Sequence, residues 1–377
     1  MKNEEVKLIP NKLVSLNETE ETIPVNIKKV GSEYKWNQGI TGKGVVVAVI
    51  DTGCELSHPD LSEQIIGGYN FTKEYGGDIS IFQDKNGHGS HTAGIIAAST
   101  SGYGKGGIIG VAPSAKLLIL KALNENGGGT IKDLIEAIHY AIDWRGPSQE
   151  KVRVISLSLG TKNPTKLLHE AVQRAVANDI PVVVAAGNDG DGNQFTNEYR
   201  YPGAFEEVIE IGAVDEKDEI AHFSNTNEYV DLYAPGVDIH STYLNREFAV
   251  LSGTSMAAPH VAGAIALLIE EYEEKFGRNV SEKEIYDILM SHTRVITQNG
   301  TKRHILSLSN ANVKGEDGTM ENREMLLKCF CEARRTQAYF TKCLDEKSTK
   351  EEKDFILELV RESAKTSNKI REFCEKC

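Results

Sequence analysis

The feature that most restricts the possible folds is a regular alternation of apolar strands and amphipathic helices, which begins near residue 45. Residues 45–50 are continuously apolar and rich in β-branched side chains, as expected of a strand covered on both faces in a parallel sheet. Segments of the same character follow at 117–123, 152–159, 181–186 and 208–214. These runs indicate a buried, mainly parallel sheet.

Between the strands, apolar residues recur with the period of about 3.6 that is typical of helices burying one face. The two clearest sets are Ile131, Leu134, Ile135, Ile138 and Ile142, and Leu167, Leu168, Ala171, Val172, Ala175 and Val176. Right-handed crossovers between parallel strands place such helices on both faces of the sheet. We therefore predict an α/β fold of three layers with a doubly wound, mainly parallel sheet.

The alternating pattern ends in a short segment at 304–308, and residues 314–318, Lys-Gly-Glu-Asp-Gly, are typical of a linker. Beyond the linker the chain is rich in Glu, Lys and Arg with spaced apolar residues, which favours charged amphipathic helices. We predict a main domain over 21–313 and a helical extension over 314–377.

Composition excludes several classes of partner. An excess of 55 acidic over 42 basic residues gives a net charge of −13, which disfavours nucleic acid and anionic membranes. Residues 1–6 lack the apolar run of a secretory signal, and no stretch approaches the roughly 18 apolar residues of a spanning helix. We expect a cytoplasmic protein without a nucleic-acid or membrane partner.

The cysteines are concentrated in the extension, which contains Cys329, Cys331, Cys343, Cys374 and Cys377. In a reducing compartment the free thiol is their expected state. Their spacing is not a standard zinc spacing, so a reduced helical hairpin for docking or assembly is favoured over a zinc site. The remaining cysteine, Cys54, is expected to be a buried small apolar residue rather than a functional thiol.

Four distant segments each place one chemically active side chain at the end of a predicted strand or the start of a helix. The first is Asp51, which follows the strand at 45–50 directly, with Gly53 allowing the chain to turn away. A carboxylate there lies at the carboxyl edge of the sheet, where open α/β folds place their sites. Taken alone, Asp51 would more often be a turn or helix-capping aspartate.

The second side chain is His88, which lies between Gly87 and Gly89 at the start of an alanine-rich helix. A neutral imidazole anchored by a carboxylate is the group that general-base catalysis needs. His88 and His91 could instead form a metal pair, but no further His or Cys has zinc-site spacing nearby. We expect His91 to pack as a structural residue.

The third and fourth side chains are Ser255 and Asn188. Ser255 lies among small residues at the start of an apolar helix, where backbone N–H groups and the helix dipole can activate a hydroxyl. Asn188 follows a buried strand, where its amide could donate to an oxyanion. Alone, Ser255 could be an ordinary N-cap and Asn188 a plain turn residue.

Together the four segments resemble the subtilisin family of serine proteases, whose triad follows the order Asp, His, Ser along the chain. The likeness extends from about residue 5 to residue 310. It implies that Asp51 orients His88, and that His88 takes the proton of Ser255 as this attacks a peptide carbonyl. It also implies an oxyanion hole formed by the Asn188 side chain and the Ser255 N–H. Catalysis would need no cofactor.

The resemblance also assigns residues that contact substrate. Ser158, Leu159 and Gly160 match the family's edge segment, which pairs with an extended peptide as a β-strand. Arg200 falls where the family places the floor of the S1 pocket, so that a cation there would favour acidic residues before the scissile bond. Pairing of Arg200 with Asp189 is an equally good alternative, and such exposed pairs are weak.

The likeness is closer to the intracellular subtilisins, whose short N-terminal extension lies across the active site and is removed on activation. Leu8, Ile9 and Pro10 match that branch, although Asn11 replaces its usual aromatic residue. We therefore predict that residues 1–20 form an inhibitory segment. The family often forms homodimers, so a second copy of the chain is a candidate partner.

Asp60 matches the family's carboxylate ligand for a structural calcium ion, and hard oxygen ligands suit Ca²⁺. A simple cap of the following turn is the alternative role for Asp60.

The function predicted from the sequence is an endopeptidase of broad specificity that cleaves unfolded or misfolded proteins in the cytoplasm. A protease dedicated to processing one substrate is the nearest alternative. A catalytically inactive scaffold that binds through the extension is a third possibility, which the four intact motifs disfavour.

Overall fold

The computed structural model describes residues 5–8, 12–16, 23–99, 107–193, 196–298 and 300–309, together with residues 358, 359, 365 and 369. The chain divides into two compact units, 1–312 and 313–377. In the second unit the four described residues are helical, and all five tail cysteines lie outside the described residues. Among the described residues, no helix has the length and apolar character needed to cross a membrane.

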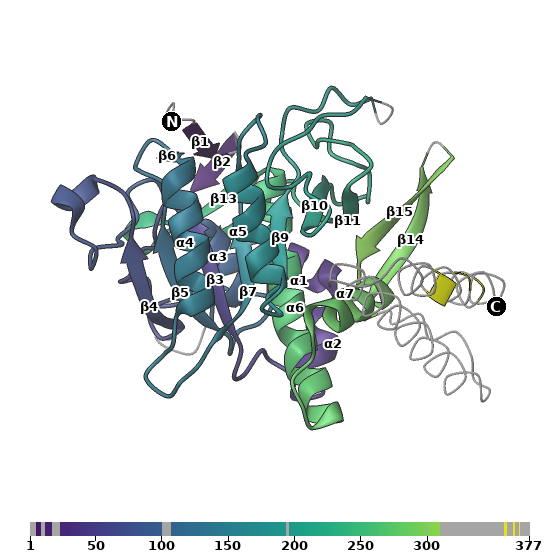
Figure 1. The fold of residues 1–377 in the computed structure, drawn as a ribbon, viewed down its shortest axis with the longest axis horizontal. Coiled ribbons are helices and arrows are strands. Elements are labelled where there is room, and N and C mark those ends of the chain that lie inside the picture. The colour runs from purple at the N-terminus through teal and green to yellow at the C-terminus, as the bar shows by residue number, and fades with distance from the viewer. Residues whose placement is uncertain are drawn as a thin grey trace. The chain divides into compact units, whose positions relative to one another are not determined.

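A nine-stranded sheet forms the middle of the first unit (Figure 1). Its spatial order is β14-β15-β11-β10-β9-β7-β3-β5-β4. These strands pair in parallel, with the exception of the antiparallel β14–β15 hairpin. The strands are β3 (Val46–Asp51), β4 (Ile65–Asn70), β5 (Lys116–Lys121), β7 (Val152–Leu157), β9 (Val182–Ala185), β10 (Ile209–Val214), β11 (Val230–Pro235), β14 (Thr293–Gln298) and β15 (Thr301–Leu306).

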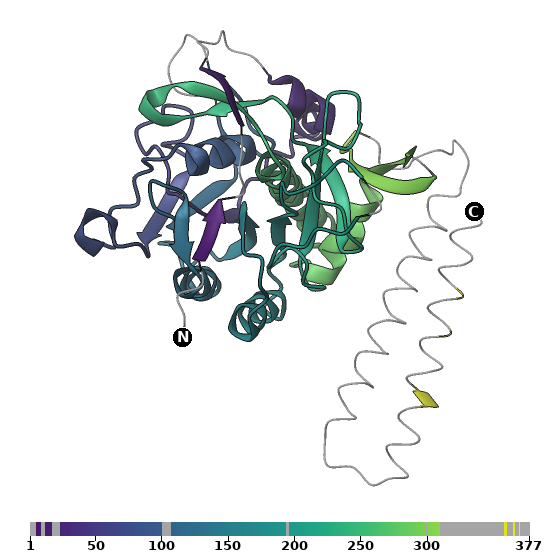
Figure 2. The same cartoon turned by 90° about the horizontal axis from the view of Figure 1, so that it is seen from above.

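Helices cover both faces of the sheet (Figures 1 and 2). Along β3, Val47 and Val49 pack in the core formed with α3 and α6, whereas Val46 and Ile50 pack in the core formed with α4 and α5. The three-layer α/β prediction is therefore confirmed. The four helices are α3 (His88–Ala97), α4 (Ile131–Asp143), α5 (Lys166–Val176) and α6 (Thr254–Phe276).

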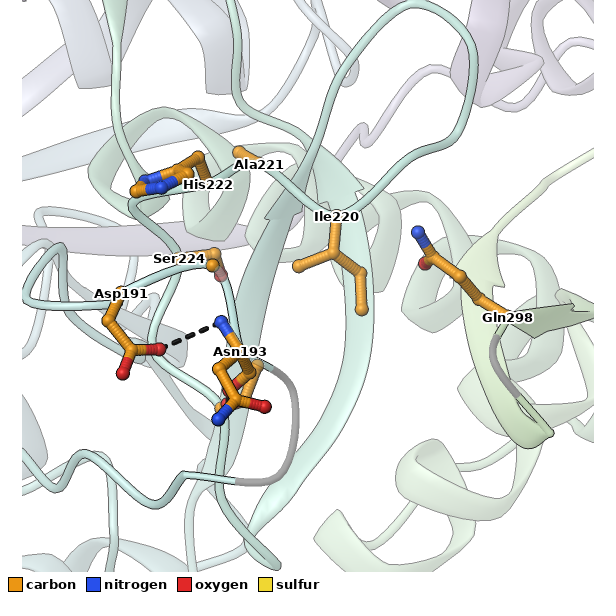
Figure 3. A pocket seen from close by; sticks show the side chains of 9 residues that line it. Asp191, Asn193, Ile220, Ala221, His222, Ser224 and Gln298 are labelled. Atoms are coloured by element: carbon orange, nitrogen blue, oxygen red, sulfur yellow. Dashed lines mark hydrogen bonds between the residues drawn. The ribbon is translucent and has the colours of Figure 1, made fainter.

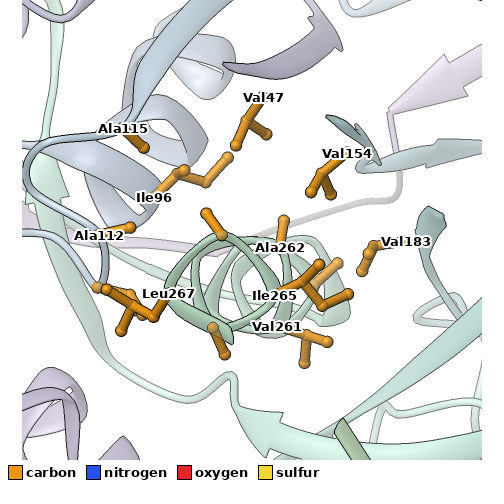
Figure 4. Close-up of a cluster of buried hydrophobic side chains, with 14 of the residues drawn as sticks. Val47, Ile96, Ala112, Ala115, Val154, Val183, Val261, Ala262, Ile265 and Leu267 are labelled. Carbon is orange, nitrogen blue, oxygen red and sulfur yellow. The ribbon is translucent and has the colours of Figure 1, made fainter. Parts of the chain in front are cut away.

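Helix α6 lies at the centre of the larger core (Figure 4). Its residues are buried continuously from Thr254 to Glu270, which is typical of a helix surrounded by other elements. Small side chains allow the close approach, since a Cβ on Gly263 would lie 2.7 Å from Val111 Cβ. The N-terminus of α6, which carries Ser255, is thus held by a large part of the core.

Side-chain caps fix the starts of several helices. Thr130 accepts a hydrogen bond from the N–H of Asp133 at the start of α4, and Thr165 does the same for α5. A capping box of Ser281 and Glu284 starts α7 (Glu282–Ser291). The remaining helical segments are α1 (Val25–Val30), α2 (Ser32–Trp36) and the 3₁₀ turns η1 (Glu74–Gly77) and η2 (Leu244–Arg246).

Two small sheets flank the main one, and each contains a strand from the N-terminal segment. In the first, β1 (Glu5–Leu8) lies between β6 (Gly128–Thr130) and β8 (Leu159–Gly160). In the second, β2 (Lys12–Leu16) pairs with the edge of the β12–β13 hairpin. The hairpin strands are β12 (Ile239–Thr242) and β13 (Phe248–Ser252). The sequence analysis predicted neither sheet.

Candidate active site

Asp51 and His88 meet at the carboxyl edge of the main sheet. Asp51 is the last residue of β3, and His88 is the first residue of α3. The imidazole Nδ1 lies 2.8 Å and 2.9 Å from the two carboxylate oxygens, and both residues are 1% exposed. A carboxylate at Nδ1 stabilises the tautomer that carries its proton there and leaves Nε2 as the basic nitrogen.

Ser255 lies in the first turn of α6 and is completely buried. Its Oγ donates to the backbone carbonyl of Ser158 at 3.3 Å, and the Ser158 Oγ donates to the carbonyl of Ser255 at 2.9 Å. Within the described part of the chain, the buried Nε2 of His88 has no hydrogen-bond partner. In this state the Ser255 hydroxyl therefore points to the Ser158 carbonyl, in the predicted substrate edge, and not to the imidazole.

Asp84, which the sequence analysis missed, joins the turn after Asp51 to the turn that carries His88. It is 3% exposed and accepts hydrogen bonds from the Thr52 hydroxyl at 2.9 Å, the Gly87 N–H at 3.0 Å and the Ser90 hydroxyl at 2.7 Å. An aspartate two residues before Asn-Gly looks like a turn residue in sequence. Only the fold shows that Asp84 joins the turn after Asp51 to the turn before His88.

Asn188 is anchored beside the nucleophile candidate. Its Oδ1 accepts from both the N–H and the hydroxyl of Thr254, each at 2.9 Å, and Thr254 directly precedes Ser255. The Thr254 hydroxyl also accepts from the N–H of Gly187 at 3.1 Å. These contacts fix the plane of the Asn188 amide, with Oδ1 on the Thr254 side and Nδ2 turned away from it.

The predicted substrate edge pairs with the protein's own N-terminal segment. Strand β1 is antiparallel to both neighbours, with Lys7 opposite Gly160, Leu8 opposite Leu159 and the Leu8 N–H donating to the Gly127 carbonyl at 2.8 Å. The Val6 side chain is buried at 1% exposure. Leu8 is thus at this edge, whereas Ile9 and Pro10 lie outside the described residues.

Arg200 is paired with Asp189 through two contacts, one of them 2.7 Å long, and this pair lowers the pKa of Asp189. The stem of Arg200 lies beside the predicted substrate edge, because a Cβ added to Gly160 would be 3.4 Å from Arg200 Cβ. A Cβ added to Gly187 would be 2.9 Å from Arg200 Cγ. Of the two alternatives from the sequence, the ion pair is the one present.

Asp60 offers one carboxylate for the expected calcium site. It is 6% exposed, and its Oδ2 accepts from the N–H of Ile108 at 2.9 Å. The described residues contain no cluster of three or more His, Cys, Asp or Glu able to hold a metal ion. Ca²⁺ takes six to eight oxygen ligands, so a site at Asp60 would take most of them from backbone carbonyls and other neutral oxygens.

Two other predicted roles are decided by burial. His91 is fully buried, and its Nε2 contacts the carbonyls of Ile239 and Ala249, which makes it a structural residue. Cys54 is also fully buried, and burial raises the pKa of its thiol. Neither side chain is placed for chemistry on a peptide.

Glu210, on β10, carries a buried carboxyl group close to Gly203, three residues after Arg200. Its side chain is 0% exposed, and a Cβ added to Gly203 would be 2.8 Å from Glu210 Oε1. Burial raises the pKa of Glu210 to about 8, and burial also raises that of neighbouring Asp231 to about 6. These groups affect stability and do not touch the triad candidates.

A surface pocket lies apart from the Asp51–His88 pair (Figure 3). It is lined by segments 191–193 and 220–226 and by Gln298 from β14. Its one drawn hydrogen bond joins the Asn193 N–H to the Asp191 carboxylate at 2.7 Å. It contains none of the predicted catalytic residues.

A buried Asp–His pair, a serine at a helix N-terminus and an anchored asparagine, all on a doubly wound sheet, define a serine protease of the subtilisin type. Residues 42–319 match the profile of the Subtilase family, peptidase family S8, and the chain belongs to this family. It is a serine endopeptidase, as the sequence analysis predicted.

Named relatives agree with this assignment. The chain is 47% identical over 296 residues to the major intracellular serine protease of Bacillus subtilis, covering 77% of this chain and 89% of the relative. It is 46% identical over 288 residues to an intracellular serine protease of Paenibacillus polymyxa, covering 76% and 85%. Subtilisin DY of Bacillus licheniformis is 40% identical over 253 residues, covering 67% and 86%.

Proposed function

We propose that the protein is an intracellular, broad-specificity endopeptidase in which Asp51, His88 and Ser255 form the triad and Asn188 completes the oxyanion hole. The 2.8 Å contact between Asp51 and His88 Nδ1, with Nε2 left without a partner among the described residues, is the observation that carries this proposal. That arrangement is the one a general base requires. The two intracellular relatives support the location inside the cell.

In the reaction, the Ser255 hydroxyl turns from the Ser158 carbonyl to His88 Nε2. Its oxygen attacks the peptide carbonyl as Nε2 accepts the proton, and Asp51 stabilises the resulting imidazolium. The Asn188 amide and the Ser255 N–H donate to the oxyanion. His88 then gives the proton to the leaving amine, and a water molecule hydrolyses the acyl-enzyme by the same steps.

The first test is labelling with a fluorophosphonate probe together with casein digestion. Ser255→Ala should abolish labelling and digestion. Ser62→Ala changes an exposed serine that is not among the predicted site residues, and should leave labelling and digestion unchanged. Labelling that persists in Ser255→Ala would refute the assignment of the nucleophile.

The N-terminal segment is proposed to keep the enzyme inactive until it is cut. Strand β1 already pairs with both edges that a substrate would use, so it blocks them in this state. A chain that begins at residue 21 should be more active on casein than the full chain. Equal activity of the two would refute inhibition by this segment.

Structural calcium is proposed on the basis of the Asp60 carboxylate, with backbone carbonyls as the expected further ligands. If calcium is bound, chelation by EDTA should lower the melting temperature of the wild type and have little effect on Asp60→Asn. A melting temperature that EDTA leaves unchanged would contradict a calcium site. A homodimer likewise stays a prediction, and sedimentation would test it.

A further inference from the structure

Lys121 is a buried cation that the catalytic mechanism does not use. It ends β5, lies opposite Asp51 in the register of β3 and β5, and is 0% exposed. Its Nζ donates to the carbonyls of Thr52 at 2.5 Å and Leu123 at 3.0 Å. Burying an ammonium group costs free energy unless a group of opposite charge pairs with it. We therefore expect a carboxylate that pairs with Lys121.

That partner is Glu74, on the 3₁₀ turn η1. Its Oε2 lies 2.7 Å from Lys121 Nζ, and its side chain is 13% exposed. The second oxygen, Oε1, accepts from the backbone N–H of Glu125 at 2.9 Å. Glu74 therefore connects the cation beside Asp51 to the loop 124–127.

This loop forms one side of the peptide-binding site. Its Gly127 carbonyl accepts from the Leu8 N–H, and β6, which follows directly, pairs with β1. The carbonyl of Glu125 is held as well, because Asn86 Nδ2 donates to it at 2.9 Å while Asn86 Oδ1 accepts from the His88 N–H at 3.2 Å. The N–H and the carbonyl of Glu125 are thus each hydrogen-bonded to a side chain, that of Glu74 and that of Asn86.

We propose that Glu74 and Lys121 are positioning residues. Their ion pair holds loop 124–127 in the position needed to bind the backbone of an extended peptide beside the triad. The proposal rests on the proposed function of the triad. It predicts that loss of the pair impairs substrates that pair with β6 and spares substrates too short to reach it.

The test starts from the full chain and compares kcat/KM for a tetrapeptide amide with kcat/KM for a single-residue ester. Each variant is assayed with both substrates in one preparation after its N-terminal segment has been cut, so that β1 does not compete with the tetrapeptide for β6. Glu74→Gln removes the ionic contact with Lys121 and the charge that strengthens the hydrogen bond from the Glu125 N–H, and should lower the ratio about tenfold. The loss should appear mainly in KM for the tetrapeptide.

Glu63→Gln is the matched control, because it neutralises an exposed carboxylate outside η1 and loop 124–127. If an unpaired Lys121 prevents Glu74→Gln from folding, the double variant Glu74→Gln/Lys121→Met removes both charges and should show the same lowered ratio. An unchanged ratio in the folded variant would overturn the proposal. Absence of fluorophosphonate labelling in a chain that begins at residue 21 would instead refute the triad itself.

Discussion

The proposed catalytic side chains and the proposed peptide-binding edge are held in different ways. Asp51 and Ser255 extend from β3 and α6, elements buried in the main core. Strands β6 and β8 have three and two residues, and they are fixed by a few polar ties and by the strand that lies between them. The chemistry should therefore depend on single reacting groups, while peptide binding should be adjustable in smaller steps.

The largest expected effect concerns the reacting groups. Asn188→Ala should lower kcat by roughly 10²–10³, the scale found for the corresponding subtilisin asparagine, with little change in KM. Asn178→Ala, which changes an exposed asparagine just after α5, is the control. A lower kcat with an equal rise in KM would mean that Asn188 shapes the binding edge and not the oxyanion hole.

A smaller effect is expected at the binding edge. The Leu8 N–H faces Gly127, so the Lys7 N–H faces β8 on the opposite side of the strand. Lys7→Pro removes that donor and should raise fluorophosphonate labelling of the full chain by about tenfold. Lys7→Ala changes only an exposed side chain and should label like the wild type. Equal labelling of the two variants would show that β1 does not limit access.

Specificity should change by less. Asp189→Asn frees the Arg200 guanidinium, so cleavage after Glu or Asp, relative to cleavage after Leu, should rise about threefold to tenfold. Asp191→Asn removes a nearby exposed charge that does not pair with Arg200 and should leave the preference unchanged. Cleavage profiles on a peptide library measure it, and an unchanged profile would separate Arg200 from the S1 site.

Substitution of Glu210 should have the smallest effect on activity. Its main effect should be on stability. The folded pKa of Glu210 is raised from 4.5 to about 8, so the folded protein holds this proton more tightly than the unfolded chain. The free energy of unfolding should therefore fall as pH rises from about 4.5 to 8, by an amount on the order of a few kcal/mol. Glu210→Gln should flatten this fall in denaturant titrations. The exposed Glu206→Gln should retain it, and a parallel slope in both variants would contradict the assignment.

The sequence was sufficient for the main sheet because its strands carry their own signal. The apolar run before Asp51 predicted β3 within one residue at each end, since every residue of that strand is buried. The same logic predicted that Asp51, His88, Ser255 and Asn188 lie at one edge; in the structure Asp51 contacts His88, and Asn188 contacts Thr254, which directly precedes Ser255. Strand ends and glycine-flanked helix starts are local features that a sequence displays directly.

The ties around the site could not be predicted in this way. Asp84, Glu74 and Lys121 act through partners far along the chain. Asp84 and Glu74 look like common turn or surface residues, and Lys121 is a single charge within a predicted apolar strand. Strands β6 and β8 consist mostly of small residues, so their pairing depends on a strand supplied from the N-terminus. Such contacts are decided by tertiary packing and leave no periodic pattern.

Tethering gives the pairing of β1 a kinetic consequence. A ligand joined covalently to its own site experiences an effective concentration in the millimolar range, whereas dilute proteins in a cell compete at far lower concentrations. A single cut in the connection would convert this ligand into a free peptide that dilution removes. One bond can therefore separate a dormant enzyme from an active one, and the change would not reverse on its own.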